Sequence, residues 1–334
     1  MNEQCRIAFV GSHQEGKECL QEILDEGGNV VAIFTFTEDI ARKTSGAVSF
    51  ADIAANYDIP LFKVKDTNTP EAVAHFRQIN PDVIFVIGWT RLVSNEILKI
   101  PKYGCIGMHA SLLPKYRGRA PVNWALIHDE TESGNTTILL DEGVDTGKII
   151  AQRSFSITLS DTCETVYHKV AKAGRTMLRE ILPMLQDGDK LPYVIQKHEE
   201  GSVLPKRRPE DGIIDWNKRA MDLFNWVRAL THPYPGAFTF HNSRKLFIWE
   251  ARIAHCPVME NEDYHSLATI KPGTVMSISD GITVLTGAKE LLSVHRLNFE
   301  DEKEMIWDEF LSAHPLQERE LLGLSSIQSV MSIK

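Results

Sequence analysis

The chain lacks the marks of membrane, secreted and zinc-binding proteins. Its longest apolar run, Val83 to Trp89, is far shorter than the roughly 20 residues that span a bilayer. Its first residues, MNEQCRIAFVG, show no basic start followed by an apolar stretch and a cleavage site, so we expect a first strand and no secretory signal. The cysteines are odd in number and include no Cys-x-x-Cys pair: Cys5, Cys19, Cys105, Cys163 and Cys256. This pattern argues against a zinc site or a disulfide framework and fits a reducing, cytoplasmic location, and no metal site is expected.

Positive charge is also scarce. The chain has 36 Lys and Arg against 45 Asp and Glu, a formal net charge of -9. A broad, non-specific nucleic-acid surface needs clustered positive charge, so the balance argues against one, although a single local basic patch remains open.

Three common catalytic motifs are missing. The first predicted strand-to-helix turn, GSHQEG, lacks the Gly-x-Gly-x-x-Gly of dinucleotide-binding folds. No Walker A sequence and no Gly-x-Ser-x-Gly elbow occur. Nicotinamide, nucleotide-hydrolysis and serine-hydrolase functions are therefore not supported.

The first half of the chain alternates strand-like and helix-like segments. The expected strands are 6–10, 30–36, 83–88 and 105–108, and the third is apolar throughout, as in a strand buried on both faces. Helical spacing lies between them, and a long helix is expected from Cys163 to Gln186 with Asp161 as its cap. The alternation of strands and helices predicts an α/β domain, residues 1–186, with a Rossmann-like parallel sheet covered by helices on both sides.

The second half has a different pattern. Residues 187–210 are polar and contain three prolines, which predicts an interdomain linker, with a long surface loop of a single domain as the alternative. Short strands with Gly and Pro turns follow, so residues 211–315 are predicted to form a smaller antiparallel β-barrel, and 316–334 a tail.

The densest group of reactive side chains is GMHASLLPKYRGRAPVNW, residues 107–124. His109 follows a predicted buried strand, and the carboxyl ends of parallel strands line the ligand crevice of open α/β sheets. The next loop carries Lys115, Tyr116, Arg117 and Arg119, which suit a polar or anionic substrate. The alternative is a structural histidine beside a solvated basic face.

A second group is LLDEGVDTGKII, residues 139–150, a tight acidic loop between two extended segments. Its spacing does not match an EF-hand, so calcium is not expected. Asp145 lies between Gly143 and Gly147, which would permit a close approach to another strand end. A histidine with a carboxylate that orients it is sufficient for proton-transfer catalysis.

These motifs resemble a known family. The sequence resembles the 10-formyltetrahydrofolate-dependent formyltransferases over nearly the whole chain. The segments that carry the resemblance are SLLPKYRG after a histidine, then DTGKI, LPKRRPEDGIIDW and HPYPGAFTF. That family includes methionyl-tRNA formyltransferase and the sugar N-formyltransferases that act on amino-sugar nucleotides. The resemblance implies an N-terminal formyltransferase catalytic domain and a barrel-like, OB-like C-terminal domain.

The resemblance also implies roles for individual residues. His109 would be the catalytic histidine and Asp145 its carboxylate partner. The formyl donor, 10-formyltetrahydrofolate, would lie beside Gly88, Trp89, Thr90, Arg91, Leu92, Leu139, Leu140, Asp141, Glu142 and Val144. The acceptor would contact Ser111, Lys115, Tyr116, Arg117, Arg119 and Asn123.

One position departs from the family pattern. The family usually carries Asn two residues before the histidine, where its amide helps to hold the formyl oxygen, and here that residue is Gly107. A missing oxyanion donor costs about 10²–10³ in rate. Either another donor replaces it, such as Asn123 or a backbone amide, or the enzyme is slower, or the chain is a folate-binding or formyl-folate-hydrolysing relative without formyl transfer.

The acceptor is predicted to be the primary amine of an amino-sugar nucleotide. The segment where tRNA-binding relatives carry a basic loop, TFTEDIARKTSGAVSF, has only Arg42 and Lys43. Residues 205–334 hold 15 Lys and Arg against 18 Asp and Glu, which gives little support for a large tRNA footprint. KYRGRAPVNW instead resembles the sugar-nucleotide enzymes. Methionyl-tRNA formyltransferase remains the alternative, and a homodimer is compatible with the resemblance.

Overall fold

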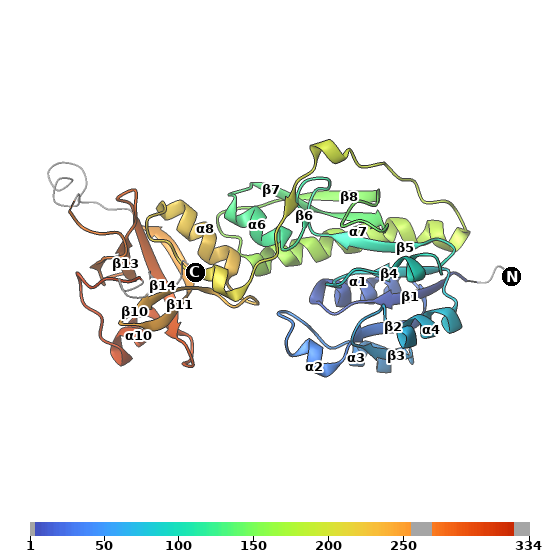
Figure 1. Ribbon diagram of the computed structural model, residues 1–334, viewed down its shortest axis with the longest axis horizontal. Coiled ribbons are helices and arrows are strands. Elements are labelled where there is room, and N and C mark those ends of the chain that lie inside the picture. Colours follow the sequence, from blue (N-terminus) through green and yellow to red (C-terminus); the bar gives the residue numbers. More distant parts are fainter. Residues whose placement is uncertain (1–3, 255–268, 324–334) are drawn as a thin grey trace. The chain divides into compact units, whose positions relative to one another are not determined.

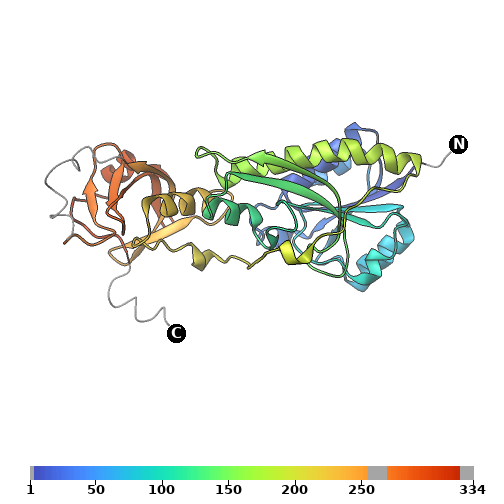
Figure 2. The same ribbon diagram turned by 90° about the horizontal axis from the view of Figure 1, so that it is seen from above.

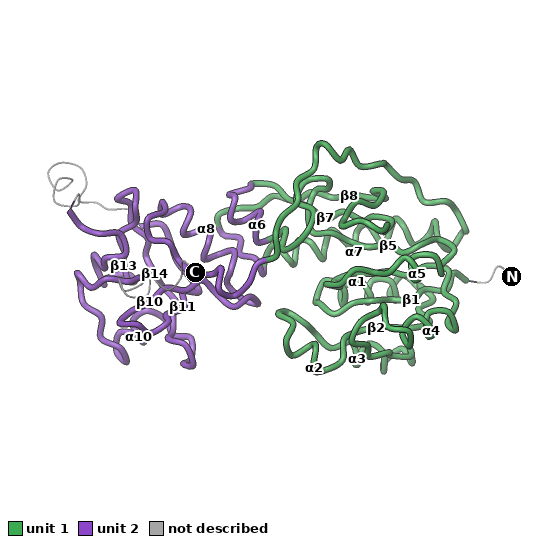
Figure 3. Tube along the Cα trace, in the orientation of Figure 1, with its two compact units in different colours: residues 1–122, 131–159, 165–206 green, residues 123–130, 160–164, 207–334 purple. Residues whose placement is uncertain are grey.

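The computed structural model describes residues 4–254 and 269–323 (Figure 1). The chain divides into two compact units (Figure 3). Unit 1 comprises residues 1–122, 131–159 and 165–206, and unit 2 comprises 123–130, 160–164 and 207–334. Residues 187–206 of the segment expected to link two domains are therefore counted with unit 1.

Unit 1 is built on a seven-stranded sheet in its described residues, with the order β3-β2-β1-β4-β5-β7-β8. The strands are β1 (Arg6–Val10), β2 (Asn29–Phe36), β3 (Leu61–Val64), β4 (Val83–Val86), β5 (Cys105–His109), β7 (Glu132–Leu139) and β8 (Lys148–Ser156). A separate two-stranded ladder joins β6 (Arg117–Gly118) to β9 (Val203–Leu204). The helices are α1 (Gln14–Asp25), α2 (Glu38–Ala41), α3 (Ala51–Asn56), α4 (Pro70–Ile79), α5 (Asn95–Leu98) and α7 (Cys163–Asp187), whose first two residues are counted with unit 2.

The predicted α/β fold is confirmed, with one refinement in the direction of the strands. Strands β1 to β5 pair in parallel, as expected from the alternation of strands and helices. Strand β7 pairs antiparallel with both β5 and β8. The reason is local: the loop after Leu139 is a hairpin turn, which can only join antiparallel neighbours, so the sheet is mixed.

Helices cover both faces of this sheet. One face packs against α1, α3 and α7 through a core that includes Leu20, Ile53 and Leu178. The opposite face packs against α4 and α5 through Phe76 and Ile97. Figure 2 shows α7 along one face and α4 on the other. Because β4 is apolar on both sides, it lies fully buried between the two cores.

Unit 2 is an open, half-barrel antiparallel sheet, which confirms the small barrel-like domain. Its described strands are β10 (Ala237–His241), β11 (Arg244–Ala254), β12 (Val275–Ser277), β13 (Ile282–Leu285), β14 (Leu291–Phe299) and β15 (Met305–Ile306). The described helices of the unit are most of α6 (Pro121–Ile127), α8 (Ala220–Leu230) and α10 (Trp307–Ala313). Short 3-10 turns occur in unit 1 at His198–Glu200 and in unit 2 at Pro209–Gly212.

Two expectations reach residues that the structure does not describe. Cys256 and the last part of the predicted tail, 324–334, lie outside the described residues. The four described cysteines are buried and unpaired, and no described helix is long and apolar enough to cross a membrane.

Candidate active site

Three loops meet near the carboxyl end of β5. They are residues 88–94 after β4, residues 110–119 after β5, and the 140–147 turn, which leaves β7 beside the start of β5 and reaches back to Gly118. Arg119 Nη1 donates to Thr90 O at 2.8 Å and joins the first two loops. The Asn95 side-chain amide bonds the Glu142 carboxylate, which joins the start of α5 to the hairpin. The order of the strands reverses at this edge, between β1 and β4, as at the ligand sites of open α/β sheets.

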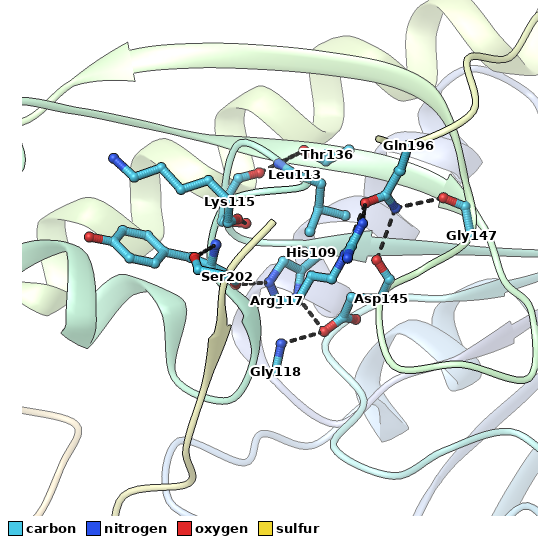
Figure 4. A network of polar contacts seen from close by, with 12 residues as sticks. His109, Leu113, Lys115, Arg117, Gly118, Thr136, Asp145, Gly147, Gln196 and Ser202 are labelled. Carbon is cyan, nitrogen blue, oxygen red and sulfur yellow. Dashed lines mark hydrogen bonds and ion pairs between the residues drawn. The ribbon is translucent and has the colours of Figure 1, made fainter. Parts of the chain in front are cut away.

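His109, the last residue of β5, is only 8% exposed, and both of its ring nitrogens face acceptors (Figure 4). Nε2 lies 2.7 Å from the backbone oxygen of Tyr116. A carbonyl oxygen only accepts, so Nε2 carries a hydrogen and donates it. The other ring nitrogen, Nδ1, lies 3.5 Å from Asp145 Oδ2.

Asp145 is held at the tip of the hairpin by an unusual backbone. Its φ is +53°, in the left-handed region that is costly for a residue other than glycine. Gly147 follows, where a Cβ would lie 1.9 Å from Leu139 O, so no other residue fits there. The carboxylate accepts a hydrogen bond from Gly118 N at 2.8 Å, which ties it to the loop that follows β5. The end of β5 and the β7–β8 turn thus bring together the imidazole of His109 and the carboxylate of Asp145, which are far apart in the sequence.

Gly107 lies two residues before His109 on the same face of β5, because side chains alternate along a strand. A Cβ at this position would meet Leu140 Cδ2 at 2.7 Å. Leu140 therefore fills the space that a side chain at 107 would need. No side-chain donor can come from residue 107 while Leu140 keeps this position.

Both parts of the chain match models of one enzyme family. The model for formyl transferase matches residues 5–182, which is more than half of the chain. The chain belongs to the formyl transferase family. The model for the C-terminal domain of formyl transferase matches residues 206–315 as well.

Solved structures of several formyl transferases and related proteins share the fold. WlaRD, a sugar 3N-formyl transferase solved with dTDP and 5-N-formyl-THF, is 17% identical, with a TM-score of 0.63 over 90% of this chain and all of WlaRD. HypX from Aquifex aeolicus, solved with tetrahydrofolic acid, is 16% identical, with a TM-score of 0.65 over 97% of this chain, which spans 51% of HypX. Methionyl-tRNA formyltransferase from Clostridium thermocellum is 19% identical, with a TM-score of 0.55 over 75% of this chain and 94% of that protein. These similarities show the fold.

The residues expected at the folate donor lie on two neighbouring loops of this formyl transferase. Trp89 stacks on Phe36 at 4.0 Å between ring centroids, and its buried Nε1 has no hydrogen-bond partner among the described residues. Leu92 and Val144 are apolar but 59% and 46% exposed. On the first loop, Gly88 has φ +64° and its backbone oxygen accepts a hydrogen bond from Ser12 Oγ, Thr90 is exposed, and Arg91 forms an ion pair with Asp66 at 2.9 Å. On the second, Leu139 is the last residue of β7, and the Asp141 carboxylate accepts hydrogen bonds from Gly143 N and Thr146 Oγ1 within the hairpin turn.

The residues expected at the acceptor are placed less uniformly. Lys115 and Arg119 are exposed on the loop after β5. Ser111 is buried and donates to Lys115 O at 2.7 Å, and the buried Tyr116 turns its backbone oxygen to His109. Asn123 belongs to unit 2, where its side-chain amide donates to Ala229 O.

Arg117 is placed differently from its expected role at the acceptor. Its side chain is only 5% exposed, and its guanidinium donates twice to Gln196 within unit 1. Two of its donor nitrogens are therefore bonded inside unit 1.

Sequence reasoning missed two residues of the segment after α7. Gln196 and Ser202 both contact the loops of the site, and Ser202 Oγ accepts from Tyr116 N at 2.9 Å. The available signal was the length of the predicted linker, residues 187–210, because long connections in which no helix or strand is predicted are uncommon and frequently functional.

Proposed function

We propose that this formyl transferase moves the formyl group of 10-formyltetrahydrofolate to the primary amine of an amino-sugar nucleotide. The observation that carries the proposal is the contact between His109 and Asp145, made by two separate loops at the ligand-binding edge of the sheet. In the reaction, the amine nitrogen forms a bond to the formyl carbon, and the bond from that carbon to N10 of the folate breaks.

The proposed role of the pair is to balance the protons of this transfer. The attacking amine loses one proton and the departing N10 gains one, so a group that accepts and returns a proton is needed beside the formyl carbon. His109 holds its Nε2 hydrogen on Tyr116 O and presents Nδ1 toward Asp145, which stabilises the ring when it is charged. The tetrahedral oxyanion requires a separate donor, and Gly107 supplies no side chain for it.

Two features support a folate as donor and a nucleotide-linked amine as acceptor. Exposed apolar side chains, Leu92 and Val144, lie on the two loops expected at the pteridine ring. Exposed Lys115 and Arg119 lie on the loop beside His109, where they suit a diphosphate. Two of the related structures were solved with folates, and WlaRD was solved with dTDP.

The test is formyl transfer to a panel of nucleotide-linked amino sugars. We expect His109→Ala and Asp145→Ala each to reduce transfer by at least about 10³-fold, because each removes half of the proton-transfer pair. Folate binding, followed by the fluorescence of Trp89 with Trp89→Phe as the control, should survive in both variants. Full activity in both variants would refute the mechanism.

Methionyl-tRNA is the second candidate acceptor, favoured by the fold shared with the Clostridium thermocellum enzyme. Binding of initiator tRNA would weaken steeply with salt, because each phosphate contact releases counterions. Absence of a tRNA complex even at low salt would eliminate this candidate.

A further inference from the structure

We infer that Gln196 is a positioning residue for formyl transfer, because it fixes the backbone that carries Asp145 opposite His109. The inference rests on the proposed function and adds a residue from the segment after α7 to its machinery. Gln196 is buried, at 4% exposure, and every contact described below lies within unit 1.

The side-chain amide of Gln196 holds the hairpin backbone directly after Asp145. Nε2 donates to Asp145 O at 2.9 Å and to Gly147 O at 2.6 Å (Figure 4). These two bonds satisfy both hydrogens of the amide group. They fix the peptide that joins Asp145 to Thr146 and the peptide that follows Gly147, next to the carboxylate that faces His109.

Arg117 decides which way the Gln196 amide points. Its Nε and Nη2 donate to Gln196 Oε1 at 3.1 and 2.7 Å. A guanidinium offers only donors, so the oxygen of the amide must face Arg117 and its nitrogen must face the hairpin. The positive charge on the oxygen side also strengthens the bonds that the nitrogen donates, because linked hydrogen bonds polarise one another.

The hairpin needs this support because its backbone is strained at Asp145, the residue that faces His109. Asp145 has φ +53°, a conformation that costs of order 1 kcal/mol or more and persists only when its surroundings enforce it. The contact between His109 Nδ1 and Asp145 Oδ2 is 3.5 Å, already at the long end of a useful interaction. A small relaxation of the hairpin would therefore separate the pair.

The same segment also positions the other partner of His109. Ser202 Oγ accepts from Tyr116 N at 2.9 Å, and Ser202 O accepts from Arg117 N at 2.8 Å. Tyr116 has φ +62° and presents the oxygen that receives the Nε2 hydrogen of His109. Both acceptors that hold the imidazole thus depend on residues 196–204, which lie far from His109 in sequence.

Two substitutions separate the roles of the Gln196 amide. Gln196→Leu removes all four hydrogen bonds, whereas Gln196→Glu retains the acceptor for Arg117 but cannot donate to Asp145 O or Gly147 O. We expect kcat to fall by about 10- to 100-fold in both variants, as for other residues that orient a reacting group, with little change in the KM of either substrate. The control is Gln21→Leu, since Gln21 also donates two side-chain hydrogen bonds but lies on α1, bonded to Asp25 and Tyr57.

A double-mutant cycle shows whether Gln196 acts through Asp145. If it does, Gln196→Leu combined with Asp145→Asn should be no slower than Asp145→Asn alone, because the first change only displaces a group that the second removes. If the rate loss of the double variant equals the product of the losses of the two single variants, the inference is overturned. So would a Gln196→Glu enzyme of full activity, because Arg117 would then be the partner that matters.

The NMR signals of the His109 ring give a readout that does not need turnover. We expect Gln196→Leu and Asp145→Asn to displace the ring signals of His109 in the same direction, because both remove the carboxylate charge from beside Nδ1, and Gln21→Leu to leave them unchanged. If the wild-type protein forms no formyl product with any amine, the proposed function fails, and these spectra still decide the positioning role. Unchanged His109 signals in Gln196→Leu overturn that role even if its unfolding temperature falls.

Discussion

Substitution of Gly107 by Asn is predicted to fail as a simple gain of an oxyanion donor. The side chain would point to the same face of β5 as His109, where an amide could reach the formyl oxygen. The obstacle is Leu140, whose Cδ2 lies 2.7 Å from the position that a Cβ at residue 107 would occupy. A real Cβ does not tolerate that contact, so Leu140 must move before any amide can be accommodated.

The magnitude follows from two opposing terms. Overpacking costs about 1–3 kcal/mol, and the low end applies here because Leu140 is half-buried and the clash is with the end of its flexible side chain. Replacing a glycine within a strand returns about 0.5–1 kcal/mol, because the unfolded chain loses freedom. We therefore expect Gly107→Asn to lower the free energy of unfolding by no more than about 1 kcal/mol, with a melting temperature lower by about 2–4 °C for each kcal/mol in a domain of this size. Its formyl-transfer rate should stay close to that of the wild type.

The informative variant combines Gly107→Asn with Leu140→Ala, which opens the space. If the amide then reaches the oxyanion, the rate should rise by about 100-fold or more over that of Leu140→Ala alone. Gly107→Ala is the matched control: it carries the same clash and no amide, so it should lose stability without gaining rate. Thermal unfolding and transfer to the best amine of the panel measure both quantities.

Two results would refute this reasoning. If Gly107→Ala unfolds at a higher temperature than the wild type, Leu140 does not occupy the space in the way described. If Gly107→Asn alone is much faster than the wild type, the side chain finds the oxyanion without any change at Leu140, and the steric account of the missing donor is wrong.

Two carboxyl groups on α1 should give opposite pH dependences of stability. Burial raises the pKa of Glu15 from 4.5 to about 7 in spite of the hydrogen bond from Asn135. The contribution of Glu15 to the free energy of unfolding is therefore greatest below pH 4.5 and declines by up to about 3 kcal/mol as the pH rises through 7. Glu15→Gln should therefore stabilise the protein in urea at pH 8 and not at pH 4, and equal effects at both would contradict the assignment. Burial alone would raise the pKa of Glu22, but hydrogen bonds from Arg175 and Arg179 outweigh it and lower the pKa below 4.5. Glu22→Gln should lower the free energy of unfolding by about 1–2 kcal/mol at pH 7, and the difference from the wild type should narrow as the pH falls below 4.5. If the variant is equally destabilised in acid, the ion pairs of Glu22 are not the source of the effect.

The amino-acid sequence by itself determined the layers of the catalytic unit. Local periodicity marks strands such as Val83–Val86 and the long helix α7, because burial on one or both faces leaves a repeat in the sequence. The sequence also predicted a tight acidic loop between two extended segments, and the structure shows this loop as the turn between β7 and β8. The family motifs named His109 and Asp145 as partners before any geometry was known.

Only the tertiary structure decided how that pair is held. The burial of Arg117 against Gln196, and the bond from Tyr116 N to Ser202, join residues about 80 positions apart in the chain. Such contacts leave no periodic trace, because a hydrogen bond depends on where two loops come to lie and not on the residues beside them in sequence. The same holds for Leu140, which occupies the space beside Gly107 only because β5 and β7 are neighbours in the sheet.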